Sequence, residues 1–299
     1  MGAFKRIDMT QAQPIRLKQP IGVRIKLGRP APFDPLAPVL GRLCELEVRL
    51  ARSRAELREA QQLRYHVFYE EMNAKPSAFQ RMTRRDRDVF DKFCDHLLVI
   101  DTTRPAGSRI VGTYRLLQQD KAALAGGFYT AGEFEIDGLI SRHPGARFLE
   151  LGRSCVLKSY RGKRTVELLW QGIWAYVKQH RIDVLFGCAS LSGTDLTALE
   201  APLAFLRENA PPPEDWRVSA VAGRRARVAG SVSCLDPKRA LASLPPLLKG
   251  YLRIGGYVGL DAVVDHQFGT TDVLVIMPVK NIKARYVQHF DTEGTRSAA

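Results

Sequence analysis

The sequence predicts a mixed α/β fold of the α+β type, with a mostly antiparallel central sheet flanked by helices. Two strand-like runs at 96–101 and 109–117 are joined by a short turn that contains proline and glycine, which indicates an antiparallel hairpin. Apolar strands at 148–157 and 183–189 flank an amphipathic helix at 161–181, which is the pattern of a β-α-β crossover. A hairpin followed by a crossover indicates a mixed sheet.

The other elements follow from local patterns. Ser53 and Glu56 have the spacing of a capping box, so we expect a helix to begin there and to run to about residue 71. Alternation, caps and prolines predict the rest. These elements are a strand at 46–50, a helix at 195–208, a helix at 237–254 and a strand at 271–279.

The bulk composition is that of a soluble globular protein. The chain has 299 residues, of which 45% are hydrophobic and 25% charged, enough for a substantial core. No apolar run reaches the length of a membrane span, and the basic N-terminus lacks the apolar part of a signal peptide, so we expect a cytoplasmic protein. We expect an N-terminal extension at 1–41, one folded domain at 42–290 and a tail at 291–299.

The extension at 1–41 is basic and rich in proline. It carries seven Lys or Arg residues against two Asp, so we expect it to be poorly ordered. The alternative is attachment to an anionic membrane surface, where each cation contributes about 1 kcal/mol. The two interpretations are compatible.

The whole chain is strongly basic. Its net charge is +14 and its isoelectric point is about 9.8, which favours an acidic partner such as nucleic acid, anionic lipid or an acidic carrier protein. No RRM, helix-turn-helix or zinc-finger pattern is present, so we expect no nucleic-acid partner. General solubility is the alternative explanation of the charge.

Two other patterns are interpreted as structural. The five cysteines are scattered without zinc-ligand spacing, so we expect no metal site and reduced thiols, with a catalytic thiol at Cys155 as the less favoured alternative. His96 and Asp101 match the H-x4-D pattern of glycerolipid acyltransferases. Residues five apart on a strand point to opposite faces, so these two side chains are not expected to pair.

The strand at 148–157 carries a glutamate where a core strand is otherwise apolar. Glu150 lies between Leu149 and Leu151, and Arg153 follows three residues later. Gly152 predicts a bulge, which would bring Glu150 and Arg153 to one face. A carboxylate among apolar neighbours has a raised pKa and suits a general base. A purely structural ion pair between the two is the alternative.

A basic turn follows this strand directly. Arg161, Gly162, Lys163 and Arg164 stand at the start of the next helix, where free N–H groups and the helix dipole favour an anion. The alternative is a solvated turn without a ligand.

This order of elements resembles the GNAT N-acyltransferase superfamily, whose donor phosphates bind at that helix start. The GNAT turn has the pattern R-x-x-G-x-G/A, whereas Arg164 and Val166 occupy the two glycine positions here. Larger side chains crowd the space for a coenzyme A pyrophosphate, so the departure puts ordinary acetyl-CoA use in doubt.

A narrower resemblance covers residues 42–290. It is similar to the bacterial L-ornithine N-alpha-acyltransferases of ornithine-lipid synthesis and, less closely, to the acyl-homoserine-lactone synthases. The matching motifs lie at 63–72, 94–96, 112–116, 150–153, 250–253 and 268–272.

The resemblance implies transfer of a 3-hydroxyacyl group from acyl carrier protein to the α-amino group of L-ornithine, which gives lyso-ornithine lipid. It implies no metal or redox cofactor. Glu150 would be the base, Arg153 or Arg115 would bind the substrate carboxylate, and Asp95 or Asp91 would hold the distal ammonium. The basic turn would bind the phosphopantetheine phosphate and the acidic carrier, and backbone N–H groups near 155–157 would stabilise the oxyanion.

Two alternatives remain open. One is an autoinducer synthase that uses S-adenosylmethionine, although the long C-terminal part of this chain disfavours it. The other is a non-catalytic basic protein that binds membrane or nucleic acid on a decayed acyltransferase fold.

Overall fold

The computed structural model describes residues 33–226 and 236–283 and confirms the predicted fold class. Within this part of the chain, eight strands form one sheet in the order β1-β2-β3-β4-β5-β6-β8-β7. Neighbouring strands are antiparallel except β5 and β6, which are parallel. The strands are β1 Val39–Leu43, β2 Leu46–Leu50, β3 Asp95–Asp101, β4 Ile110–Gln118, β5 Phe148–Val156, β6 Val184–Ser192, β7 Tyr257–Asp265 and β8 Thr270–Pro278.

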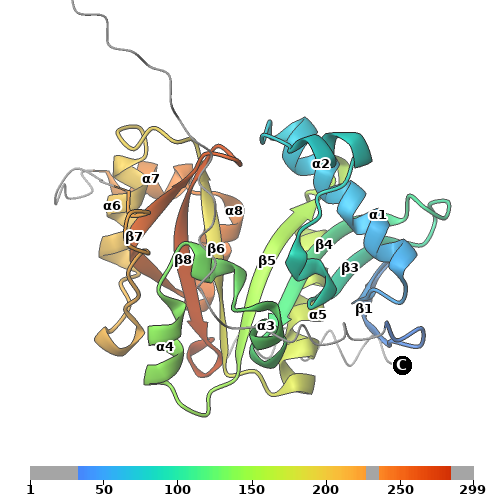
Figure 1. Ribbon diagram of the computed structural model, residues 1–299, viewed down its shortest axis with the longest axis horizontal. Coiled ribbons are helices and arrows are strands. Elements are labelled where there is room, and N and C mark those ends of the chain that lie inside the picture. Colours follow the sequence, from blue (N-terminus) through green and yellow to red (C-terminus); the bar gives the residue numbers. More distant parts are fainter. Residues whose placement is uncertain (1–32, 227–235, 284–299) are drawn as a thin grey trace, which may run out of the picture.

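Helices cover both faces of the sheet (Figure 1). We call the face that carries Glu150 the front face. It is covered by α1 and α4, whose apolar side chains pack in the hydrophobic core on this face of the sheet. The helices α2 and α3 lie on the same side. The back face is covered by α5 and, further along the sheet, by α6, α7 and α8. The α-helices are α1 Arg54–Tyr65, α2 Ala78–Thr83, α3 Gln119–Ala125, α4 Ile136–Arg142, α5 Lys163–His180, α6 Glu200–Asn209, α7 Pro237–Ser243 and α8 Pro246–Ile254.

Three short helical segments also shape the front side. The first helix passes directly into a π-helix, η1 His66–Glu71, and two 3-10 turns follow, η2 Val89–Lys92 and η3 Tyr129–Gly132. The predicted cap is present, because the Ser53 side chain accepts a hydrogen bond from the Glu56 amide.

The structure corrects two helices. The single helix expected at 237–254 is two helices, because Pro245 and Pro246 lack the N–H that would continue the first one. The helix expected at 195–208 begins only at Glu200. Asp195, where the helix was expected to begin, accepts a hydrogen bond from the Thr197 amide in the turn that precedes α6.

The folded part begins before the boundary expected at residue 42, because β1 starts at Val39 and pairs with β2. The expectations for residues 1–32 and 284–299 lie outside the described residues. None of the described helices is long and apolar enough to cross a membrane.

Candidate active site

The two parallel strands of the sheet separate in its middle. β5 and β6 pair at only three positions, the last being Glu150 opposite Phe186, although both strands continue for six further residues. A Cβ atom added to Gly187 would lie 2.3 Å from the carbonyl oxygen of Leu151, so glycine permits the close approach at the point of separation. Beyond this point β5 and β6 do not pair with each other. We call this region the strand opening.

A bulge in β5 lies beside the strand opening, as Gly152 predicted. Between two register points, β5 advances from Gly152 to Cys155 while β4 advances only from Arg115 to Thr113. Arg153 takes up the extra residue with φ of 51°, in the left-handed region. The bulge brings the Arg153 side chain to the front face, where the guanidinium lies 4.6 Å from the ring centre of Tyr129.

Glu150 is buried on the same face and holds the turn that contains Tyr129. Its Oε2 accepts a hydrogen bond from the Tyr129 amide at 3.0 Å, and its Oε1 accepts bonds from the Thr130 amide at 2.6 Å and from Thr130 Oγ1 at 2.5 Å. Burial raises the pKa of Glu150 above its ordinary value, whereas the donors of Thr130 and Tyr129 act in the opposite direction. No direct bond joins Glu150 to Arg153 among the described contacts, so the two share a face without forming the simple ion pair.

Three arginines and three aspartates form a buried network next to Glu150. Arg64 Nε lies 2.9 Å from Asp86 and its Nη2 lies 2.8 Å from Asp91. Arg115 lies 2.6 Å from Asp88. Equal numbers of opposite charges offset the cost of burial, because an unpaired buried charge is strongly destabilising.

Arg153 is the least tightly held member of this network. Its shortest ion-pair distances are 3.3 Å to Asp86 and 3.7 Å to Asp88, whereas the shortest distance is 2.8 Å for Arg64 and 2.6 Å for Arg115. Its guanidinium also contacts the ring of Phe268, 4.8 Å away, in the turn between β7 and β8. Arg153 is therefore the network cation best placed to exchange a partner for a substrate carboxylate.

A second group of carboxylates lies across the strand opening from Arg153. Oxygen atoms of Glu133, Asp265 and Asp272 all lie within 4.8 Å of one another. Burial and the neighbouring Asp272 raise the pKa of Glu133 to about 7. Such oxygens suit a hard cation or an ammonium group.

Side-chain contacts connect this group to Glu150. The Cys188 thiol lies 3.3 Å from Glu133 Oε2 and 3.7 Å from Thr130 Oγ1, and that hydroxyl donates to Glu150. Glu133 and Glu150 therefore belong to one continuous site, although Glu133 follows β4 in the chain and Glu150 lies on β5.

The basic turn begins α5, as predicted, with Gly162 at the N-cap position. Arg161 pairs with Glu71, and its Nε donates to the Val156 carbonyl at 2.9 Å. Lys163 is exposed and pairs only loosely with Glu167, at 3.4 Å, and Arg164 is also exposed. Within residues 33–226 and 236–283, no side chain caps the helix start, so its N–H groups are available to an anion.

Comparison with known proteins then decides the family. Residues 63–171 match the model of the acetyltransferase (GNAT) domain. The L-ornithine N(alpha)-acyltransferase of Rhizobium meliloti (strain 1021) is 51% identical over 90% of this chain and 92% of its own length. The enzyme of the same name from Rhodobacter capsulatus is 41% identical over 82% of this chain and 94% of its own. The chain belongs to the L-ornithine N(alpha)-acyltransferase family. It is an acyltransferase of the GNAT type.

Solved structures are matched at lower similarity. The AHL synthase LasI is 13% identical with a TM-score of 0.42, covering 77% of this chain and 89% of its own. FeeM, an N-acyl amino acid synthase from uncultured soil microbes, is 8% identical with a TM-score of 0.39, covering 79% and 91%.

The sequence suggested Asp95 and Asp91 for the distal ammonium, and only one of the two lies on the same face as Glu150. Asp95 lies on the back face, where Lys121 contacts it at 2.7 Å and the Tyr176 hydroxyl donates to it at 2.5 Å. The sheet therefore separates it from Glu150, and this placement does not fit the role suggested for Asp95. Asp91 is on the front side, but Arg64 and Gln61 already occupy its oxygens.

The interpretation of the H-x4-D pattern agrees with the geometry. His96 Nε2 contacts the Asp91 carbonyl oxygen at 2.8 Å, while Asp101 accepts hydrogen bonds from Thr103 and Tyr160. The two residues have separate partners. Burial raises the pKa of Cys155 to about 12, so its thiol stays protonated and is a poor nucleophile.

One suggested oxyanion donor is already occupied. The Leu157 amide donates to the Val111 carbonyl at 2.9 Å, so it points toward β4 and away from the strand opening. It cannot serve a thioester that lies in the opening.

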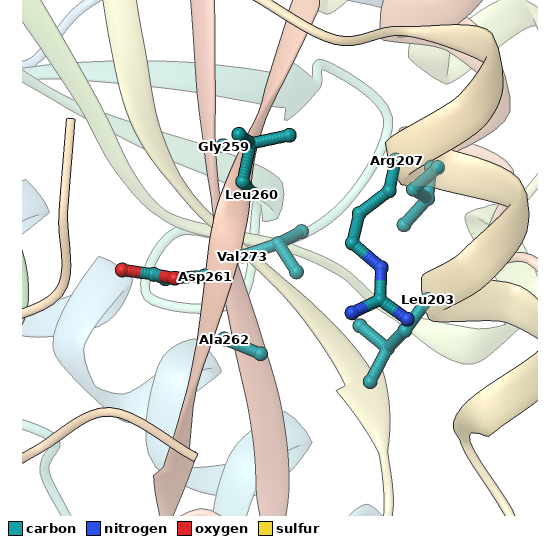
Figure 2. Close-up of a pocket in the computed structure, with 8 residues that line it drawn as sticks. Leu203, Arg207, Gly259, Leu260, Asp261, Ala262 and Val273 are labelled. Carbon is teal, nitrogen blue, oxygen red and sulfur yellow. The ribbon is translucent and has the colours of Figure 1, made fainter. Parts of the chain in front are cut away.

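A separate hollow lies on the other side of the sheet. Figure 2 shows Leu203 and Arg207 of α6 facing β7, which carries Leu260. Asp261 points away from this hollow, and its carboxylate accepts the Ala220 amide at 2.9 Å. Because α6 covers the back face, we assign the hollow no part in the acyltransferase site.

Sequence reasoning missed Glu133 and Asp265 altogether. Asp272 stands in a motif that carried the family resemblance, and this was the available signal. Glu133 precedes α4 and Asp265 ends β7, so only the folded chain brings them together.

Proposed function

We propose that this protein transfers a 3-hydroxyacyl group from acyl carrier protein to the α-amino group of L-ornithine, giving lyso-ornithine lipid. The observation that carries this is the meeting of Glu150 and Arg153 on one face at the strand opening, in a chain whose relatives are named L-ornithine N(alpha)-acyltransferases. The reaction needs a base for the amine and a cation for the carboxylate, and these two side chains supply them.

Glu150 is the proposed base. A carboxylate has about four lone-pair positions, and the turn at Tyr129 and Thr130 occupies two on Oε1 and one on Oε2. One position on Oε2 is left for the substrate amine or for a bridging water. The raised pKa makes Glu150 a stronger proton acceptor than an exposed glutamate.

The substrate's other charged groups have complementary partners nearby. Arg153 binds the carboxylate of ornithine, assisted electrostatically by Arg115. Glu133, Asp265 and Asp272 supply the negative charge for the distal ammonium, in place of Asp91 and Asp95. No metal or redox cofactor takes part in this proposal, because the thioester already carries an activated acyl group.

The donor side is the start of α5. Its free N–H groups and the side chains of Arg161, Lys163 and Arg164 bind the phosphodiester of phosphopantetheine and acidic residues of the carrier. The net charge of +14 favours the approach of an acidic protein. We place the enzyme in the cytoplasm, in peripheral contact with the inner face of the cell membrane.

The test is an assay with 3-hydroxyacyl carrier protein and either ornithine or S-adenosylmethionine, with products identified by mass spectrometry. We expect acyl-ornithine to form from ornithine and no product to form from S-adenosylmethionine. A product from S-adenosylmethionine and none from ornithine would favour the autoinducer-synthase alternative. Glu150→Gln should lower turnover about 100-fold or more. Glu135→Gln makes the same change at an exposed carboxylate and serves as the control. Near-normal turnover of Glu150→Gln would show that the base is another group.

A further inference from the structure

The short helix α2 presents apolar side chains to solvent. Phe79 is 47% exposed and Met82 is 76% exposed, and their spacing of three places them on one side of the helix. Large apolar side chains that protrude from a soluble protein mark a contact surface when they occur together.

The surroundings of α2 are basic. From Met72 to Arg85 the sequence contains four cations and no acidic residue. Of the four, Arg84 pairs with Glu70, whereas Lys75, Arg81 and Arg85 form no ion pair within the described part of the chain. The surface therefore combines protruding apolar groups with unneutralised positive charge.

Hydrogen bonds anchor this surface at the edge of the candidate active site. A capping box at Ser77 and Gln80 begins α2, and the Gln80 side chain is buried and donates to the Tyr69 hydroxyl at 2.9 Å. The preceding Lys75 amide donates to the Gln267 carbonyl in the turn between β7 and β8. Figure 1 shows α2 at the end of the sheet toward which β5 points.

We propose that the α2 surface, formed by Phe79, Met82, Lys75, Arg81 and Arg85, docks onto an anionic lipid bilayer. Protruding apolar side chains flanked by cations are the features of elements that lie in the membrane interface. A fluid bilayer accepts such side chains without a preformed pocket, which a protein partner would have to provide. The choice of a bilayer over the carrier protein rests on the proposed function, because its acylated product is a lipid that leaves the site for a membrane.

The test is co-sedimentation of the full chain with vesicles of phosphatidylcholine alone or with phosphatidylglycerol. We expect binding that requires the anionic lipid and weakens with salt. The double variant Phe79→Ser, Met82→Ser should bind about tenfold or more weakly. The matched control Leu124→Ser, Leu241→Ser removes two exposed leucines outside α2 and outside residues 1–41, and it should bind like the wild type.

The variants keep residues 1–41, so unchanged vesicle binding by the α2 variant would overturn the proposal in favour of the extension as anchor. Absence of wild-type binding to anionic vesicles would also overturn it. If the α2 variant has a raised KM for acyl carrier protein and unchanged vesicle binding, the surface is a docking site for the carrier and the proposal is overturned. Vesicle binding is measured without turnover, so the two proposals can fail separately. If the wild-type chain does not acylate ornithine, but the α2 variant still loses vesicle binding, the proposed function is refuted and this inference stands.

Discussion

The close approach of β5 and β6 can be tested at Gly187. In Gly187→Ala the new Cβ would lie 2.3 Å from the Leu151 carbonyl oxygen, whereas real Cβ atoms essentially never approach such an atom within 3.0 Å. The two strands must therefore move apart by at least about 0.7 Å, the difference between these distances. Both atoms belong to strand backbones, so no side-chain rotation relieves the contact. Overpacking of this kind costs about 1–3 kcal/mol.

The same substitution at Gly250 is the control. Gly250 lies inside α8, and an added Cβ there meets no atom within 4 Å. Alanine favours a helix over glycine by about 1 kcal/mol, so Gly250→Ala should stabilise the protein. The two variants should therefore shift the free energy of unfolding in opposite directions.

Urea denaturation measures both effects, and acyl transfer to ornithine is assayed on the same samples. Because β5 also carries Glu150, turnover by Gly187→Ala should fall further than turnover by Gly250→Ala. A Gly187→Ala protein with wild-type urea midpoint and activity would refute the close contact of the two strands, and with it the position assigned to the strand opening.

Three further predictions concern charged residues. Asp95→Asn should leave the KM for ornithine unchanged and reduce stability by about 1 kcal/mol, because Asp95 lies on the back face; a large rise in KM would contradict this placement. Glu133 has a folded pKa of about 7 against an ordinary 4.5, so the folded state holds its proton more firmly. Its contribution to stability is present in full below pH 4.5 and is lost as the pH rises to 7, by about 3 kcal/mol in total. Glu133→Gln should remove this loss from denaturation curves measured across that range, and an unchanged pH dependence would count against it. Glu150 must be ionised to accept a proton, so kcat/KM should fall as the pH drops through its raised pKa; an activity that rises toward acid pH would be inconsistent with this role.

Local signals predicted much of the fold and part of the site. The bulge could be foreseen because a glycine within an apolar strand often marks a bulge, although Arg153 is the residue that takes the left-handed conformation. The separation of His96 from Asp101 followed from the two-residue period of a strand. The break before α8 was also encoded locally, since Pro245 and Pro246 cannot continue a helix, yet the apolar pattern on both sides concealed it.

Other features required the folded chain. β7 (Tyr257–Asp265) was not predicted, because a glycine and an aspartate interrupt its apolar pattern, and it is held in place by pairing with β8. The side of the sheet occupied by Asp95 depends on the register of β3, which places it beside Tyr176 of α5.

By itself, the sequence determined the periodicity of each element, the bulge beside Glu150 and the cationic start of α5, because short-range sterics and capping control these features. Only the tertiary structure decided which charges meet. Packing of a loop brings the aspartate partners of Arg153 close to it. Glu133, Asp265 and Asp272 come together from three separate segments. Their proximity results from long-range packing of the chain, for which no spacing in the sequence is a guide.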